Sequence, residues 1–145
     1  MIGKANVMST HPLVQAFYAR IWNSGDENIE DLLAADFSFR GSLGTETVGI
    51  PAFLDYVRPI RHSLADYHCE IIACVTELPH AFARMRFSGM HVRPFRGFAP
   101  TGKLVHWEGA ALFTFSGSLI SSLWVLGDLA GLDAVLHANG SARNP

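Results

Sequence analysis

The chain has 145 residues, of which 49% are hydrophobic and 17% charged, and its formal net charge is -2 with a pI near 6.4. This length and apolar content are typical of one domain with a buried core, and they argue against disorder. The slightly acidic balance does not favour nucleic acid or an anionic membrane surface, so we expect neither as a partner.

The sequence shows no signal typical of secretion, of a membrane helix or of a disulfide bond. The first ten residues contain no apolar segment typical of a signal peptide, and no apolar run approaches the ~20 residues that a membrane helix needs. Cys69 and Cys74 lie on one expected strand with an odd spacing, which predicts side chains on opposite faces and no disulfide between them. We therefore expect a cytoplasmic protein.

The N-terminal part of the chain carries signals for about three helices. Pro12 in a first turn and an apolar stripe at helical spacing predict a helix from about His11 to Asn23. Asp26 is expected to cap a short second helix, whose apolar residues are Ile29, Leu32 and Leu33.

A short strand and a third helix follow. Phe37 and Phe39 alternate with polar residues, as they would in a strand. The third helix is expected to open at Gly49-Ile50-Pro51, and Pro59 predicts a kink or a stop near Arg58, because proline lacks the backbone N–H.

From Tyr67 onward the apolar pattern has a period of two. It predicts four long antiparallel strands, with breaks at Leu78-Pro79, near Pro100 and at the Ser116-Gly117-Ser118 turn, and then a terminal helix from about Leu129. Helices gathered on one side of a mainly antiparallel sheet define an α+β fold. We expect a single domain over residues 10–138, between tails at 1–9 and 139–145.

Several motifs of this chain occur in a characteristic order. They are Trp22-Asn23-Ser24-Gly25-Asp26, Arg84 followed by Ser88-Gly89-Met90-His91, Pro100-Thr101-Gly102-Lys103, Trp124 with Asp128, and Gly131-Leu132. In that order they resemble the SnoaL-like polyketide cyclase family, within the nuclear-transport-factor-2-like (NTF2-like) superfamily, over about Leu13 to Leu136. The resemblance implies an NTF2-like cone, in which a curved sheet and its helices enclose a pocket, and a homodimer formed through the sheet.

The resemblance also implies a chemistry. Characterised members of the family close a ring by an intramolecular aldol reaction on a polyketide methyl ester, without cofactor or metal. It therefore implies an apolar small-molecule ligand and no cofactor. The family's acid/base aspartate matches Asp128, and its second polar pocket residue, a histidine in characterised cyclases, falls near Thr114.

Asp128 has two interpretations. A carboxylate in an apolar cavity has a raised pKa, so it can take a proton from a carbon next to a carbonyl and return one to an alkoxide. The same residue stands between an expected strand and an expected helix, where its carboxylate would cap the N–H groups of residues 130 and 131.

Other residues complete the expected site. His91 and His106 lie on different strands and are candidates for catalysis, whereas the seven histidines show no metal-binding spacing, so we expect no metal. Tyr18 or Tyr56 would serve as an oxyanion donor in a reaction like that of ketosteroid isomerase. Trp124 shares a face with Asp128 at a period of two, which predicts a flat pocket wall. Substrate-binding candidates are Trp124, Trp107, Trp22, Tyr18, Phe39, Met85 and Phe87.

Two alternatives remain open. The first is a non-catalytic module that binds a small molecule or dimerises through its sheet. The second is chemistry similar to that of limonene epoxide hydrolase, which the sequence disfavours, because the aspartate expected two residues after Trp124 is Leu126 here.

Overall fold

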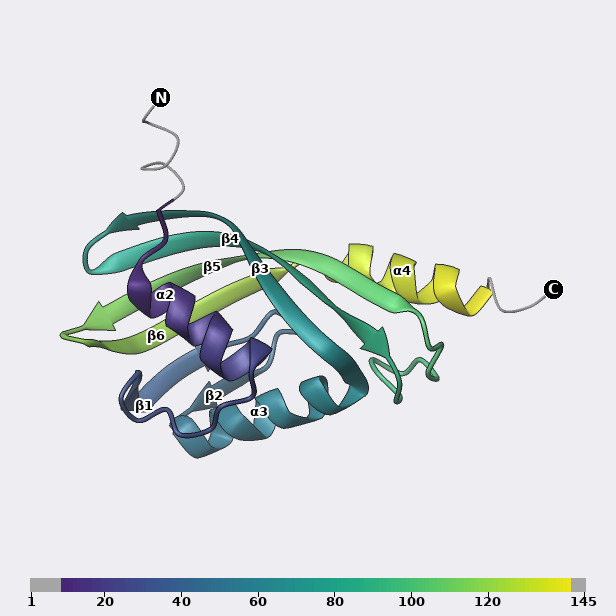
Figure 1. The fold of residues 1–145 in the computed structure, drawn as a ribbon, viewed down its shortest axis with the longest axis horizontal. Helices are drawn as coiled ribbons and strands as arrows, with labels where there is room; N and C mark the ends of the chain where they lie inside the picture. The colour runs from purple at the N-terminus through teal and green to yellow at the C-terminus, as the bar shows by residue number, and fades with distance from the viewer. Residues whose placement is uncertain (1–8, 142–145) are drawn as a thin grey trace, which may run out of the picture.

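The computed structural model describes residues 9–141, which form one α+β domain (Figure 1). The elements in chain order are α2 (Pro12–Ala16), the π-helix η1 (Phe17–Asn23), β1 (Leu33–Arg40), β2 (Glu46–Val48), α3 (Ile50–Ser63), β3 (Leu64–Glu77), β4 (His80–His91), β5 (Leu104–Ser116), β6 (Leu119–Gly127) and α4 (Leu129–Ser141). α4 continues into the expected C-terminal tail, and the remainder of both expected tails lies outside the described residues, except for Ser9.

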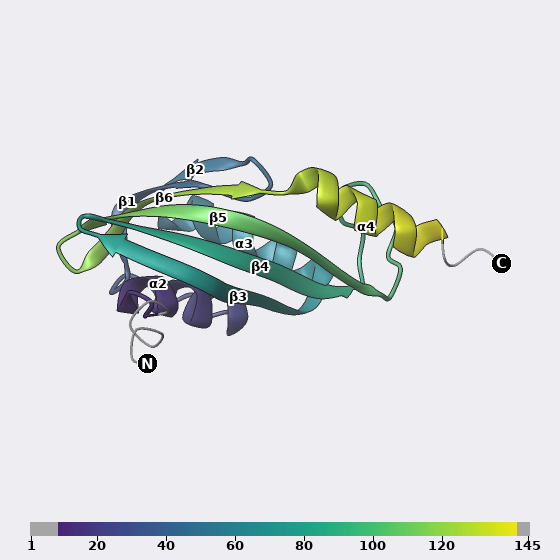
Figure 2. The same ribbon diagram turned by 90° about the horizontal axis from the view of Figure 1, so that it is seen from above.

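The six strands form one curved sheet in the order β2-β1-β6-β5-β4-β3. All neighbouring strands are antiparallel except β1 and β6, which run parallel. α2 and η1 form one continuous helix that, together with α3, covers one face of this sheet, whereas α4 extends past its end (Figure 2). We call the covered face the inner face and the opposite one the outer face. The expected α+β fold and mainly antiparallel sheet are confirmed.

The core lies between the inner face and the two covering helices. Strand β4 shows how the sequence builds it, because its residues alternate between exposed and buried along most of its length. Met85 and Phe87 point inward, while Arg84 and Arg86 point outward. Apolar residues at a period of two thus bury one face of the sheet and leave the other open to solvent.

Asn23 joins the first helix to the sheet. Its Nδ2 donates to the carbonyl of Cys69 at 3.2 Å, and its Oδ1 accepts from the amide of Cys69 at 2.7 Å. The side-chain amide therefore occupies the free edge of β3 in the way that a neighbouring strand would. This pairing sets the position of η1, which carries Tyr18 and Trp22, against the sheet.

We expect Asn23→Ala to lower the free energy of unfolding by about 2 kcal/mol, because two hydrogen bonds are lost and two backbone groups of Cys69 lose their partner. Urea unfolding followed by tryptophan fluorescence measures this change. The control is Asn28→Ala. Asn28 is exposed, and its hydrogen bonds with Arg20 and Asp26 are made by its backbone, which the substitution keeps. Equal effects of the two substitutions would contradict the role of Asn23.

The second helix expected from Asp26 onward does not form. β1 already begins at Leu33, and Ile29 and Leu32 are buried within an irregular segment. Arg20 ties this segment to η1, because its Nε donates to Asp26 Oδ2 at 3.1 Å. The apolar side chains are thus buried without helical hydrogen bonds, and the prediction of a helix was wrong.

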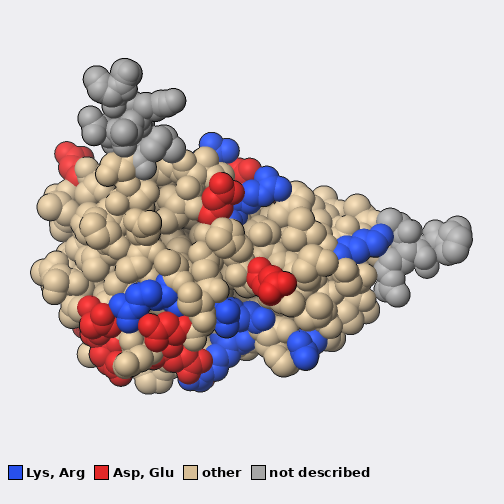
Figure 3. Space-filling view, viewed as in Figure 1, with Lys and Arg blue, Asp and Glu red and all other residues tan. Residues whose placement is uncertain are grey.

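Charged side chains gather around this segment and α3, at the lower left of Figure 3. Most of them form ion pairs, which join Arg20 to Asp26 and Asp31, and Arg58 to Glu27 and Asp55. Because these pairs are largely exposed, each contributes little to stability.

Two further predictions about elements need correction. Of the two outcomes expected near Arg58, a kink or a stop, the stop is wrong, because α3 continues through Pro59 to Ser63. Pro59 lies on the exposed side of the helix, where the carbonyl that it leaves without a partner is open to water. Cys69 and Cys74 do not lie on opposite faces, since both are buried. A β-bulge between them, at residues 71–73, inverts the alternation of β3.

Candidate functional site

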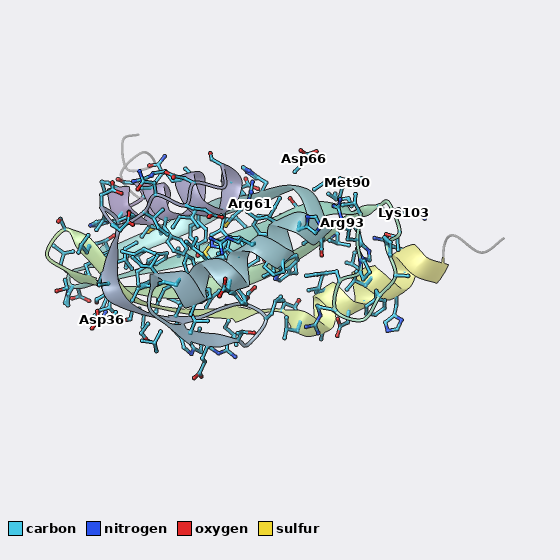
Figure 4. All side chains as sticks on the ribbon, turned by 90° about the horizontal axis from the view of Figure 1, so that it is seen from below. Asp36, Arg61, Asp66, Met90, Arg93 and Lys103 are labelled. Atoms are coloured by element: carbon cyan, nitrogen blue, oxygen red, sulfur yellow. The ribbon has the colours of Figure 1, made fainter. Side chains whose placement is uncertain are left out.

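A narrow aromatic cavity lies between the inner face, η1 and α3, where side chains from the three fill the interior (Figure 4). Its volume of about 20 Å³ is room for one water molecule. The lining residues are Phe17, Tyr18, Trp22, Phe39, Ser42, Tyr56, Ile60, Tyr67, Phe87, Trp107 and Val125.

The aromatic rings of the lining contact one another almost continuously. Trp22 lies 5.2 Å from Tyr67 between ring centroids, Tyr67 lies 6.4 Å from Trp107, and Trp107 lies 5.2 Å from Phe87. Large flat surfaces of this kind suit a planar apolar ligand.

Two polar atoms of this lining have no hydrogen-bond partner within the described part of the chain. They are Tyr18 Oη and Trp107 Nε1, and both residues are only 3% exposed. An unpaired buried polar group costs about 1–3 kcal/mol. Both atoms are donors, so a ligand oxygen in the cavity would remove this cost.

Burial raises the pKa of Tyr18 well above its ordinary value, and the nearby thiols of Cys69 and Cys74 add to the effect. Burial likewise raises the pKa of Tyr67. Both phenols therefore remain protonated at neutral pH, and Tyr18 is available as a hydrogen-bond donor.

Most of the predicted substrate-binding residues meet at this cavity. Tyr18, Trp22, Phe39, Phe87 and Trp107 line it. Met85 is buried on the same face of β4 but is not part of the lining.

Tyr67 is the main lining residue that the sequence reasoning missed. Its alternation with Cys69 at the start of the period-two pattern is the signal that could have placed it on the inner face.

Trp124 lies on the outer face, so it does not form the expected pocket wall. A register shift between β5 and β6 near residue 121 inverts the alternation of inward and outward side chains along β6. Ile120, Leu123 and Val125 are therefore buried, and Trp124 is 47% exposed. The guanidinium carbon of Arg40 stands 5.4 Å from the centroid of the Trp124 ring. Trp124 and Leu126 thus share the outer face, whereas Ile120, before the extra residue, lies on the inner one.

Asp128 caps α4. Its Oδ1 accepts from the amide of Gly131 at 2.9 Å, its side chain is exposed, and it does not line the cavity. A Cβ on Gly131 would lie 2.3 Å from Asp128 Oδ2, so the glycine allows the carboxylate to fold over the helix end. The structure thus places Asp128 as the capping interpretation expected, and not inside an apolar cavity.

The other polar candidates also lie away from the cavity. Thr114 and His106 are on the outer face, where Thr114 Oγ1 lies 3.2 Å from Nδ1 of His80. His91 is completely buried at the end of β4, and its Nδ1 lies 3.3 Å from Thr101 Oγ1. Burial lowers the pKa of His91, opposed by the backbone carbonyls of Phe98 and Arg93.

Among the residues that the structure describes, neither a carboxylate nor a histidine lines the cavity. Within residues 9–141, no group of three or more His, Cys, Asp or Glu side chains is placed to hold a metal ion. The ionisable side chains that line the cavity are the phenols Tyr18, Tyr56 and Tyr67.

The curved sheet, its helices and the interior cavity define an α+β domain of the class that includes ketosteroid isomerase and the NTF2-like proteins. The model of the SnoaL-like polyketide cyclase family matches residues 12–136, and the chain therefore belongs to this family. Membership supports a cyclase-type function. Among residues 9–141, no helix is long and apolar enough to cross a membrane.

Solved structures share this fold over most of their length. TsrD from Streptomyces laurentii is 26% identical, with a TM-score of 0.76 over 87% of this chain and 92% of that one. A proposed SnoaL-like polyketide cyclase from Jannaschia sp. CCS1 is 16% identical, with a TM-score of 0.77 over 87% and 90%. A protein with a ketosteroid isomerase-like fold from Catenulispora acidiphila, solved with trimethylamine, is 18% identical, with a TM-score of 0.75 over 89% and 95%. No curated protein matches the sequence.

Proposed function

We propose that this chain is a cyclase-type enzyme that performs cofactor-independent acid/base chemistry on an apolar carbonyl compound bound in the aromatic cavity. The observation that carries the proposal is the pair of unpartnered donors, Tyr18 Oη and Trp107 Nε1, on a mainly aromatic lining. Both would donate to a carbonyl oxygen and stabilise the negative charge that develops on it when a neighbouring carbon loses a proton.

The reaction class is an intramolecular aldol condensation or a related isomerisation. A base removes a proton from the carbon next to the carbonyl, and the enolate oxygen stays bound to Tyr18 and Trp107. The enolate carbon then attacks a second carbonyl of the same molecule, and the new alkoxide takes up a proton. Because the resting cavity is so small, binding also requires lining side chains to move.

Asp128 is our candidate for the base, on the strength of its match to the family's aspartate. The residue before it, Gly127, packs closely against Ser42, which lines the cavity. A Cβ on Gly127 would lie only 2.7 Å from the carbonyl oxygen of Ser42. To act on a substrate, the carboxylate has to exchange its bond with the Gly131 amide for a position closer to Ser42.

Deuterium exchange into 2-tetralone, a planar ketone, tests the proton-transfer step. We expect the wild-type chain to accelerate exchange at the carbon next to the carbonyl, and Asp128→Asn to lower that rate by about 100-fold or more. Asparagine is an N-cap as good as aspartate, so this variant keeps α4 and removes only the base. The matched control is Asp36→Asn, since Asp36 is exposed on β1 (labelled in Figure 4).

Full exchange by Asp128→Asn would assign the base to another residue. A second function, a non-catalytic binding module, is favoured by one observation: no carboxylate or histidine of the described part of the chain lines the cavity. Saturable binding of 2-tetralone without any exchange by the wild-type chain would establish that alternative. Epoxide hydrolysis has less support, because Leu126 lies 51% exposed on the outer face.

A further inference from the structure

Two described residues of the cavity lining lie beside solvent. Among its lining residues, only Ser42 and Tyr56 are partly exposed, while every other lining side chain is at most 7% exposed. The mouth of the cavity is therefore formed by Ser42, which follows β1, and Tyr56, which belongs to α3.

Ser42 belongs to a short turn, Gly41–Thr45, that joins β1 to β2. The turn closes on itself, because the amide of Gly41 donates to the carbonyl of Thr45 and the amide of Gly44 donates to the carbonyl of Gly41, both at 2.9 Å. Gly44 has a φ of 94°, a conformation that side chains disfavour. The turn is thus a small unit held together by its own hydrogen bonds.

The turn is held between α3 and the end of β6. On one side, a Cβ on Gly41 would lie 2.3 Å from the hydroxyl oxygen of Tyr56. On the other side, a Cβ on Gly127 would lie 2.7 Å from the carbonyl oxygen of Ser42. Two positions without a side chain therefore allow the turn to lie this close to Tyr56 and to β6.

Hydrogen bonds with the Leu43 amide and with the Ser42 side chain join the turn to Tyr56 in the closed arrangement. The amide of Leu43 donates to Tyr56 Oη at 3.3 Å, which is longer than the 2.7–3.2 Å of a typical N–H···O bond. The ring of Tyr56 packs edge-on against Phe39 at 5.1 Å and Trp22 at 6.1 Å, and both of these line the cavity. The Tyr56 ring therefore covers the cavity, and its hydroxyl is fastened to the turn by its bonds with Leu43 and Ser42.

We propose that Tyr56 and the Gly41–Thr45 turn form the gate of the aromatic cavity, and that Tyr56 sets the rate at which apolar ligands pass. The physical requirement is the cavity volume of about 20 Å³, which admits nothing larger than water until this gate opens. That the ligands are apolar follows from the proposed function. The gate itself is inferred only from the contacts of Tyr56 with the turn and with the cavity lining.

Stopped-flow fluorescence with 2-naphthol, a planar neutral probe, tests the gate in Tyr56→Phe. This variant keeps the ring and removes the hydrogen bonds with Leu43 and Ser42. A gate changes association and dissociation rates by the same factor, whereas a direct ligand contact changes mainly dissociation. We expect both rates to rise by at least about fivefold, the equivalent of one hydrogen bond or more, with the affinity unchanged. The control is Thr45→Ala. Thr45 is exposed in the same turn, and its backbone carbonyl accepts the bond from Gly41, which the substitution keeps.

A second measurement separates failure of the gate from failure of the proposed function. Hydrogen exchange at the amides of residues 41–45 reports opening without any ligand, and we expect it to accelerate in Tyr56→Phe. Unchanged rates for 2-naphthol, or a change in dissociation alone, would overturn the gate. If 2-naphthol binds to neither protein while exchange at the turn accelerates, the gate stands and the ligand cavity of the proposed function is contradicted.

Discussion

Tyr18→Phe is expected to weaken ligand binding and, at the same time, to stabilise the empty protein. The hydroxyl of Tyr18 is buried without a partner, so its removal should raise the free energy of unfolding by about 1 kcal/mol. The same removal deprives a ligand oxygen of its donor, and we expect the affinity for 2-naphthol or 2-tetralone to fall about tenfold. Urea unfolding and fluorescence titration measure the two effects in parallel.

Trp107→Phe should likewise weaken ligand binding, because it removes the second unpartnered donor and keeps a ring in the wall, but the volume lost from the buried indole should lower stability. Thr47→Val is the matched control. Thr47 Oγ1 is also buried without a partner, but Thr47 does not line the cavity, so the valine should stabilise the protein and leave ligand affinity unchanged. A loss of stability in Tyr18→Phe, or an unchanged affinity, would refute the assignment of Tyr18 as a ligand donor.

Leu112→Arg is expected to separate a homodimer, which we propose forms through the outer face of the sheet. Apolar side chains there form a row across four strands, since Val75 pairs with Phe82, Phe82 with Leu112, and Leu112 with Trp124. They are 66%, 45%, 40% and 47% exposed in the same order. An exposed apolar row of this kind is typical of an interaction surface.

An arginine at the centre of this row would have to lose its hydration in the interface, so we expect the dimer dissociation constant to rise at least 100-fold. Sedimentation velocity measures the change, and circular dichroism checks that the sheet is intact. Leu78→Arg is the control, because Leu78 is 71% exposed in the turn between β3 and β4 and lies outside the row. A wild-type chain that sediments as a monomer at high concentration would refute the proposed dimer.

The elements with local signals were predictable from the sequence. The stripe of the first helix, the Gly49-Ile50-Pro51 start of α3, and the period of two after Tyr67 all correspond to elements of the structure. The segment after Asp26 was not predictable in this way. Its apolar spacing is compatible with a helix, whereas its conformation depends on Arg20, which belongs to an earlier element.

Bulges account for the main differences at the candidate site. One irregularity in β3 turned Cys74 inward, and another between β5 and β6 turned Trp124 outward. A strand pattern read from sequence assumes strict alternation, and one additional residue inverts every position beyond it. The position of a bulge depends on how two strands pair, which is not a local property of either.

The sequence by itself determined the family, the α+β class and most of the aromatic residues that line the cavity, because these follow from motif order and from the periodicity of apolar residues. Only the tertiary structure decided that Asp128 caps α4, that Trp124 faces outward, and that Tyr18 and Trp107 each bury a donor without a partner. Whether a polar atom finds a partner depends on neighbours distant in the chain, so no local pattern predicts it.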